Sequence, residues 1–335
     1  MAPGRPILAD VAARAGVSLK TASRALNGEY GVAAKTAARV LAAARELGFR
    51  PNHLARSLAS GRTSAAVGLV ISYVSDPFLA AIMGAVEEVL APRDLHLITA
   101  SHRDDPQQQR RIVQALVERR VDALLVVTAP GDASYLQREI DHGLHVVALD
   151  RPLSGVDVDT VTVDNQAGAA GVVRRFAGTG HHRIGAVTGD RRLWTIQQRM
   201  LGFSQGMAAA GLTEDPALVI PGTGPDAVQA IRELLDRPDP PTAMFAAQNQ
   251  PGRQVIRAMR ALGRSVDLAV FDDIVDPDLL TPAPILVESG PARLGTLAAR
   301  MALERLDGLD LPPRSVVLPV PLLDGATGDP VPVTG

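Results

Sequence analysis

Two groups of side chains in this sequence are of types that bind other molecules. The first lies near the N-terminus, on a short helix expected to end at Leu26, and its outward members are Leu19, Lys20, Ser23 and Arg24. Cationic and hydroxyl side chains on such a helix can contact DNA bases and phosphates. The second group follows apolar runs of the chain and consists of Arg103, Asp150, Arg199 and Asp272. A guanidinium or a carboxylate can engage two hydroxyls or ring heteroatoms of a small ligand.

Residues 7–28 must position the first group. A first helix is expected where apolar residues recur at helical spacing, at Leu8, Val11, Ala12 and Ala15. Gly16 ends it, and Ser18 caps the second helix by accepting a backbone N–H. The inward face of that second helix is expected to be Val17, Ala22, Ala25 and Leu26. This layout predicts a helix-turn-helix, although an ordinary alanine-rich helical hairpin fits the small residues equally well.

A third helix is expected over residues 33–47, followed by Gly48. Its apolar stripe is predicted to be Val40, Leu41, Ala44 and Leu47. Packed behind the first two helices, it completes a three-helix head.

The charge of the chain is divided unevenly. The 335 residues have a formal net charge of −2 and no cysteine, and their number predicts two or three domains. Residues 1–62 hold ten lysines and arginines against three acidic residues, whereas the remainder holds 24 against 33. A basic head on an acidic body is typical of nucleic-acid binding, against the alternative of a solvated basic face.

From residue 65 onward, apolar runs alternate with amphipathic segments. The first series of expected strands is 65–72, 95–100, 123–127, 145–150 and 160–164, each separated from the next by ten or more helical residues such as 77–90 and 106–119. The second series is 183–189, 218–220, 243–247, 268–272, 285–289 and 315–323, with helices expected over 197–210, 225–235, 250–262 and 291–306. Apolar strands between helices indicate parallel sheets covered on both faces, so two doubly wound lobes are predicted.

Two facing lobes of this kind bind ligands at the carboxyl ends of their strands. Asp150 and Asp272 each end a predicted strand, Arg199 is expected to open the helix after 183–189, and Arg103 follows 95–100. Each carboxylate could instead cap a helix or turn. Ten aromatic residues are present, and Phe78 and the single tryptophan, Trp194, could either stack on a ligand or pack in the core.

Four strings in the head, DVAARAGVS, TASRALNG, ELGFRPN and ARSL, resemble in order and spacing the DNA-binding head of the lac repressor family. In the body, VGLV, RVDALLVV, VTVDN, GHHRI, QRMLGF and AVFDD resemble the family's periplasmic-binding-protein-like fold. The resemblance implies an all-α three-helix helix-turn-helix head plus an α/β two-lobed body. The chain departs from the family at Ile7 and Ala33, where the family has capping Thr and Ser, and each loss costs about 1 kcal/mol of helix stability.

The resemblance also implies the organisation of the chain. The DNA-binding domain is 1–50, the hinge helix or linker is 51–62, and the effector-binding and dimerisation domain is 63–335, with lobe 1 at about 63–163 and 291–318 and lobe 2 at about 164–290 and 319–335. Leu58 is expected to wedge into the minor groove of a pseudo-palindromic operator with a central CG. DNA contacts are implied for Leu8, Ser18, Leu19, Lys20, Thr21, Ser23, Arg24, Asn27, Asn52, Ala55 and Leu58.

Contacts to a small-molecule effector are implied for Phe78, Arg103, Asp150, Trp194, Thr195, Arg199, Gln248 and Asp272. The family's Asn-Asp pair after strand 243–247 is Gln248-Asn249 here, so an amide is kept but lengthened and the acid is lost. A sugar is the expected effector. Arg199 and Asp272 also recur in relatives that bind nucleobases.

The expected function is therefore a homodimeric, effector-controlled transcriptional regulator, most simply a repressor. No run of about 20 apolar residues and no signal-peptide core is present, so we expect a cytoplasmic, nucleoid-associated protein with no membrane partner. No P-loop, GxSxG or HExxH motif is present, and no cofactor, metal or catalytic residue is expected. The alternatives are a solute-binding protein, which needs export and has no use for a basic head, and a sugar-processing enzyme, which needs a general acid and base.

Overall fold

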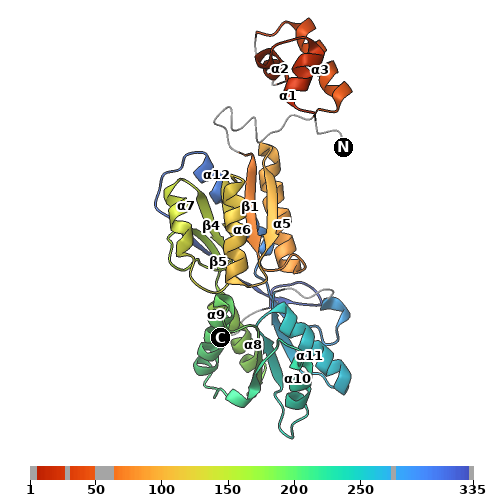
Figure 1. The fold of residues 1–335 in the computed structure, drawn as a ribbon. Coiled ribbons are helices and arrows are strands. Elements are labelled where there is room, and N and C mark those ends of the chain that lie inside the picture. Colours follow the sequence, from red (N-terminus) through yellow and green to blue (C-terminus); the bar gives the residue numbers. More distant parts are fainter. Residues whose placement is uncertain (1–5, 27–30, 50–63, 273–276, 332–335) are drawn as a thin grey trace. The chain divides into compact units, whose positions relative to one another are not determined.

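The computed structural model describes residues 6–26, 31–49, 64–272 and 277–331. The chain divides into two compact units, residues 1–64 and residues 65–335 (Figure 1). In the described part of the chain, no helix combines the length and apolar character needed to span a bilayer.

The described residues of the first unit form three helices, α1 (Leu8–Ala15), α2 (Leu19–Leu26) and α3 (Ala34–Leu47). Their small core consists of Val11, Ala12, Ala15, Ala22, Ala25, Val40, Ala43 and Ala44. Gly16 and Gly48 adopt the left-handed conformation, with φ of 62° and 65°, and end α1 and α3 as expected. The Ser18 hydroxyl accepts the Thr21 N–H at 3.1 Å, which confirms the predicted cap of α2.

The starts of α1 and α3 lack a capping side chain, as predicted, but the buried face of α3 differs from the predicted one. Neither Ile7 nor Ala33 makes a side-chain cap, although the Asp10 carboxylate accepts the Ile7 N–H at 2.7 Å. Leu41 does not belong to the buried stripe, because it is 45% exposed. Each residue turns a helix by about 100°, and the face centred on Val40 continues through Ala43 and Ala44 instead.

The second unit is an α/β body whose strands fall near the predicted apolar runs. The strands are β1 (Ala66–Ile71), β2 (His96–Ser101), β3 (Ala123–Val126), β4 (His145–Leu149), β5 (Asp159–Val163), β6 (Ile184–Thr188), β7 (Val219–Pro221), β8 (Ala243–Ala246), β9 (Asp267–Phe271), β10 (Ile285–Val287), β11 (Ser315–Leu318) and β12 (Leu322–Asp324). The helices are α5 (Pro77–Leu90), α6 (Pro106–Glu118), α7 (Gln137–Asp141), α8 (Asn165–Gly178), α9 (Trp194–Ala209), α10 (Ala227–Leu235), α11 (Asn249–Leu262) and α12 (Pro291–Leu306).

These strands form two six-stranded sheets, ordered β11-β5-β4-β3-β1-β2 and β12-β10-β9-β8-β6-β7. We call the first sheet and its helices lobe 1 and the second sheet and its helices lobe 2. The chain passes between the lobes after β5, after β10 and between β11 and β12. The two predicted doubly wound lobes are thus confirmed, with one exception to parallel pairing, since β12 runs antiparallel to β10.

Helices cover both faces of each sheet, as continuous apolar strands require. One core cluster joins α5 and α12 of lobe 1 with α8 and α9 of lobe 2. The opposite faces are covered by α6 and the segment around Leu136 in lobe 1, and by α10 and α11 in lobe 2. Ten or more helical residues were expected between successive strands of the first series. This expectation is wrong between β3 and β4, where only residues 134–141 are helical, and between β4 and β5, because residues 150–158 contain no helix.

Candidate functional site

A cavity of about 890 Å³ lies between the carboxyl ends of the two sheets. Its walls come from the segments after β1, β2 and β4 in lobe 1 and after β6, β7, β8 and β9 in lobe 2. This volume falls within the range of about 300–1,000 Å³ that is usual for small-molecule sites. The cavity therefore occupies the edge where parallel sheets present polar side chains to a ligand.

Most of the residues predicted to bind an effector line this cavity. They are Phe78, Arg103, Asp150, Thr195, Arg199, Gln248 and Asp272. Trp194 is the exception, because it is the half-buried first residue of α9 and is not among the lining residues. Arg199 does not open its helix as expected, since α9 begins at Trp194 and places Arg199 in its second turn.

Arg199 and Asp272 form a buried ion pair at the lobe 2 wall. Their side chains are 3.1 Å apart, and the two residues are only 2% and 6% exposed. Arg199 also donates to the Asn165 side chain at 2.7 Å and to the Ala247 carbonyl at 2.9 Å, and its guanidinium lies 3.6 Å from the centre of the Phe271 ring. The Ser289 hydroxyl donates to the second carboxylate oxygen of Asp272. These contacts fix both side chains before any ligand arrives.

Asp150 and Asp272 occupy matching places in the two lobes. Each follows the fourth strand of its lobe in chain order, β4 or β9, and each adopts a left-handed backbone, with φ of 68° and 67°. Arg103 and Asp104 after β2 share this conformation, with φ of 54° and 57°. Such backbones are costly for residues other than glycine and concentrate at binding sites.

Asp150 is the least satisfied carboxylate in the cavity wall. It is 4% exposed, and its Oδ1 atom has no hydrogen-bond partner in the described residues. Burial raises the pKa of Asp150, and the nearby carboxylates of Asp272 and Asp76 raise it further, against the attraction of Arg151 and Arg199. A ligand that donates a hydrogen bond to Oδ1 would relieve part of this penalty.

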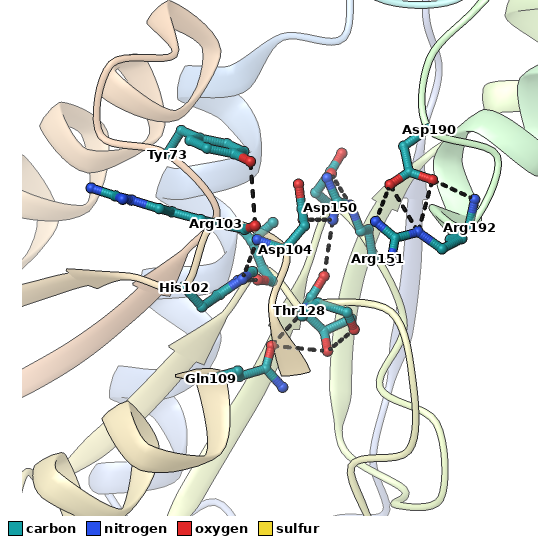
Figure 2. A network of polar contacts seen from close by, with 12 residues as sticks. Tyr73, His102, Arg103, Asp104, Gln109, Thr128, Asp150, Arg151, Asp190 and Arg192 are labelled. Atoms are coloured by element: carbon teal, nitrogen blue, oxygen red, sulfur yellow. Dashed lines mark hydrogen bonds and ion pairs between the residues drawn. The ribbon is translucent and has the colours of Figure 1, made fainter. Parts of the chain in front are cut away.

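A network of polar side chains in lobe 1 lies beside the Asp150 carboxylate (Figure 2). Arg151 lies 3.4 Å from Asp150 and donates to Asp104 at 2.9 Å and to the Thr128 carbonyl at 3.0 Å. The side-chain oxygen of Gln109 accepts hydrogen bonds from the Thr128 hydroxyl and the Ala129 N–H. These hydrogen bonds therefore connect the segments that follow β2, β3 and β4.

His102 anchors the strained turn that carries Arg103 and Asp104. Its Nδ1 accepts the Asp104 N–H at 3.0 Å, so Nε2 carries the proton and donates to the Val127 carbonyl at 2.8 Å. Burial lowers the pKa of His102, which keeps the ring neutral. The neutral ring is the form that supplies one acceptor and one donor.

Sequence reasoning missed several residues that line the same cavity. Arg151, Asp76 and Asn249 have no role in the predicted site, yet all three face the cavity. Arg151 directly follows a predicted strand end, and Asp76 precedes the helix-starting Pro77, so both carried a usable signal. In the described part of the chain, no group of three His, Asp or Glu residues could hold a metal ion.

The second predicted site is the outer face of α2. Leu19 and Lys20 are exposed, whereas Thr21, Ser23 and Arg24 are half-buried. Leu8 packs partly against the head core, and Ser18 shares a hydrogen bond of 2.8 Å with the Thr21 hydroxyl. The remaining predicted DNA contacts, Asn27, Asn52, Ala55 and Leu58, lie outside the described residues.

A helix-turn-helix head and a two-lobed body with a ligand-sized cavity together define a class, the DNA-binding regulators controlled by a small molecule. Residues 7–52 match the family described as bacterial regulatory proteins, lacI family, and residues 173–327 match a periplasmic binding protein-like domain. The HTH-type transcriptional regulator CelR of Thermobifida fusca is 33% identical, and the match covers 97% of this chain and 98% of CelR. The chain belongs to the lacI family and is a DNA-binding transcriptional regulator.

Other relatives agree with this assignment. The HTH-type transcriptional repressor PurR of Photobacterium profundum is 30% identical over 89% of this chain and 91% of PurR. A solved complex of CelR with cellobiose has a TM-score of 0.70 and 31% identity over 95% of this chain and 98% of that chain. A Lac repressor dimer bound to operator and the anti-inducer ONPF has a TM-score of 0.80 at 21% identity, over 96% and 99% of the two chains, and shares the fold.

Proposed function

We propose that this protein is a homodimeric repressor that binds a pseudo-palindromic double-stranded operator and changes its DNA affinity when a carbohydrate binds between lobes 1 and 2. The observation that carries the proposal is the cavity wall made by Asp150 and the Arg199–Asp272 pair. The effector-contacting residues are Phe78, Arg103, Asp150, Thr195, Arg199, Gln248 and Asp272. To switch the protein, the effector must bind one lobe arrangement more tightly than the other.

A carbohydrate suits the chemistry of this wall. Adjacent hydroxyls can bind a carboxylate and a guanidinium in pairs, and Asp150 offers a buried oxygen that has no partner among the described residues. Phe78 supplies an apolar ring for the face of a sugar. The complex of the related CelR with cellobiose makes a disaccharide the first ligand to test.

The direct test combines a ligand screen with an operator-binding assay. Calorimetry on the full-length protein measures binding of cellobiose, other disaccharides, monosaccharides and purine bases, and Trp194 fluorescence provides a second signal because its neighbour Thr195 lines the cavity. We expect one carbohydrate to bind and to change affinity for a two-fold symmetric DNA. Binding of a purine base alone would overturn the carbohydrate assignment, and no DNA binding would overturn the repressor assignment.

In the head, we propose that Leu19, Lys20 and Arg24 read bases while Thr21 and Ser23 hold phosphates. Replacing Lys20 or Arg24 with alanine is expected to change sequence preference at particular operator positions by about 1–3 kcal/mol each. Selection from a randomised operator library measures this preference. The matched control is Lys35→Ala on α3, which removes the same charge from an exposed site and should weaken all sequences alike. Unchanged preference in both test variants would contradict the assignment.

The hinge proposal rests on residues 51–62, with Leu58 as a minor-groove wedge beside Ala55. Leu58→Ala is expected to reduce DNA bending and to weaken specific binding, with non-specific affinity nearly unchanged because that affinity is electrostatic. Gel mobility of operators with the site placed at different positions reports the bend angle. An unchanged angle would contradict the proposed wedge.

The same proposal assigns residues 1–50 to the DNA-binding domain and residues 63–335 to effector binding and dimerisation. It places the protein in the cytoplasm with the nucleoid and gives it no catalytic role. The named relatives are transcriptional regulators, which supports this reading over a sugar-processing enzyme. Incubation of the effector with the protein, followed by mass spectrometry, should return the effector unchanged.

A further inference from the structure

A hydrogen bond links the two lobes across the cavity, away from the three crossover segments. Asp76 precedes α5 in lobe 1, and Asn249 is the first residue of α11 in lobe 2. The Asn249 amide donates to Asp76 Oδ1 at 3.1 Å. Asn249 is 6% exposed and Asp76 is half-buried, so the bond is partly shielded from water.

The surrounding contacts fix the direction of this bond. The side-chain oxygen of Asn249 accepts the Gln250 N–H at 2.6 Å, which leaves the NH₂ group to face Asp76. Asp76 Oδ1 also accepts the Phe78 N–H at 3.1 Å and so caps α5. One carboxylate oxygen therefore receives donors from the beginnings of two helices that belong to different lobes.

The amide at position 249 is essential to this arrangement. An aspartate there, the acid that the family pattern has at this place, would bring a second carboxylate to hydrogen-bond distance from Asp76. The charges would repel, and neither group could donate. An amide at position 249 can therefore donate to the Asp76 carboxylate, whereas the family's acid at that position could not.

We propose that Asp76 and Asn249 are positioning residues that hold lobes 1 and 2 in the arrangement of this structure, so that the effector meets both walls of its cavity already in place. Phe78 of lobe 1 is tied to Asp76, and Gln248 of lobe 2 directly precedes Asn249. The bond therefore sets the distance between two proposed effector contacts. The part that concerns the effector rests on the proposed function.

A protein that populates its binding-competent arrangement less often binds its ligand more weakly in proportion. Asn249→Asp is expected to open the lobes and to lower effector affinity about tenfold, the effect of losing a hydrogen bond to a charged group. Asn249→Ala removes the donor without adding charge and should act in the same direction. The exchange Asp76→Asn with Asn249→Asp restores one donor and one acceptor and should recover most of the affinity.

The lobe arrangement can be measured without any effector. Because the chain has no cysteine, Glu118→Cys on α6 and Gln229→Cys on α10 allow spin labels to be attached selectively to one exposed site in each lobe. Mixing labelled chains with an excess of unlabelled chains before pulsed electron resonance restricts the measurement to the distance between the two lobes of one full-length chain. We expect Asn249→Asp and Asn249→Ala to shift the distances upward and the exchange variant to restore them.

The control is Gln254→Glu, five residues further along α11, which adds the same charge at another position of the helix and should leave the distances unchanged. Unchanged distances in both Asn249→Asp and Asn249→Ala would overturn the proposal. So would a shift in the exchange variant as large as in Asn249→Asp. This result does not depend on finding a carbohydrate, so its failure is distinguishable from failure of the proposed function.

Discussion

Replacing Asp272 with asparagine is expected to weaken effector binding about 100-fold, the effect of removing the charge of one partner from a buried ion pair. The Asp272 carboxylate holds Arg199 at 3.1 Å and accepts from Ser289. The variant keeps the size of the side chain and one acceptor oxygen but loses the negative charge, so the buried Arg199 guanidinium contacts only neutral groups, including the Asn165 and Ala247 oxygens. The effector would lose a carboxylate and the alignment of a guanidinium at once.

Affinity for operator DNA should remain unchanged in this variant, because the helix-turn-helix belongs to the other compact unit of the chain. Titration calorimetry with the effector and operator binding without it separate the two properties. The matched control is Asp190→Asn, which removes an acid that also lines the cavity but is paired with the exposed Arg192. Equal losses in both variants, or a loss of operator affinity in Asp272→Asn without effector, would contradict the role assigned to Asp272.

The placement of Asp150 and Asp272 was predictable because it follows from topology. Parallel strands connected by helices bring their carboxyl ends to one edge of the sheet. Residues just after the apolar runs therefore gather at that edge, independently of loop conformation. The helix-turn-helix was predictable for a similar local reason, since Gly16 and Ser18 mark a helix end and a helix start within three residues.

The contacts that complete the cavity depend on distances that the sequence does not contain. The Asp76–Asn249 bond joins residues 173 positions apart, and the Arg151–Asp104 pair joins residues 47 apart. Leu41 and Trp194 were not placed correctly from their residue types, which favour burial or stacking. The rotation of α3 decides where Leu41 lies, and the start of α9 decides where Trp194 lies. The antiparallel direction of β12 could not be predicted, because β12 lies in one apolar run with β11 and the run itself carries no sign of strand direction.

A second buried acid in lobe 1 stabilises the fold rather than the cavity. Asp159, at the start of β5, accepts two hydrogen bonds of 2.9 Å from Arg305 on α12 and the Arg314 N–H at 2.8 Å. Arg305 also donates to the carbonyls of Leu309, Leu311 and Pro312. The ion pair therefore fastens the connection from α12 to β11 onto the sheet.

Asp159→Asn is expected to lower the free energy of unfolding by about 3–5 kcal/mol, as removal of one partner from a buried ion pair does. Burial opposes ionisation of Asp159, but the Arg305 guanidinium and the Arg314 N–H outweigh it and lower the pKa of the carboxyl. Because the folded-state pKa is lowered, the stabilisation is present above the pKa of the unfolded chain, about 3.9. It is lost as the pH falls through the folded-state pKa.

Urea unfolding followed by circular dichroism, repeated from pH 7 down to about pH 3, measures both the size and the sign of this effect. The difference between wild type and Asp159→Asn should be full at neutral pH and should shrink below about pH 4, since the wild type then loses the charge that the variant already lacks. The control is Asp307→Asn, whose ion pair with Arg93 is exposed and screened by solvent, so little change is expected. A difference that stays constant to the lowest pH would mean that packing around Asp159, and not its charge, stabilises this connection.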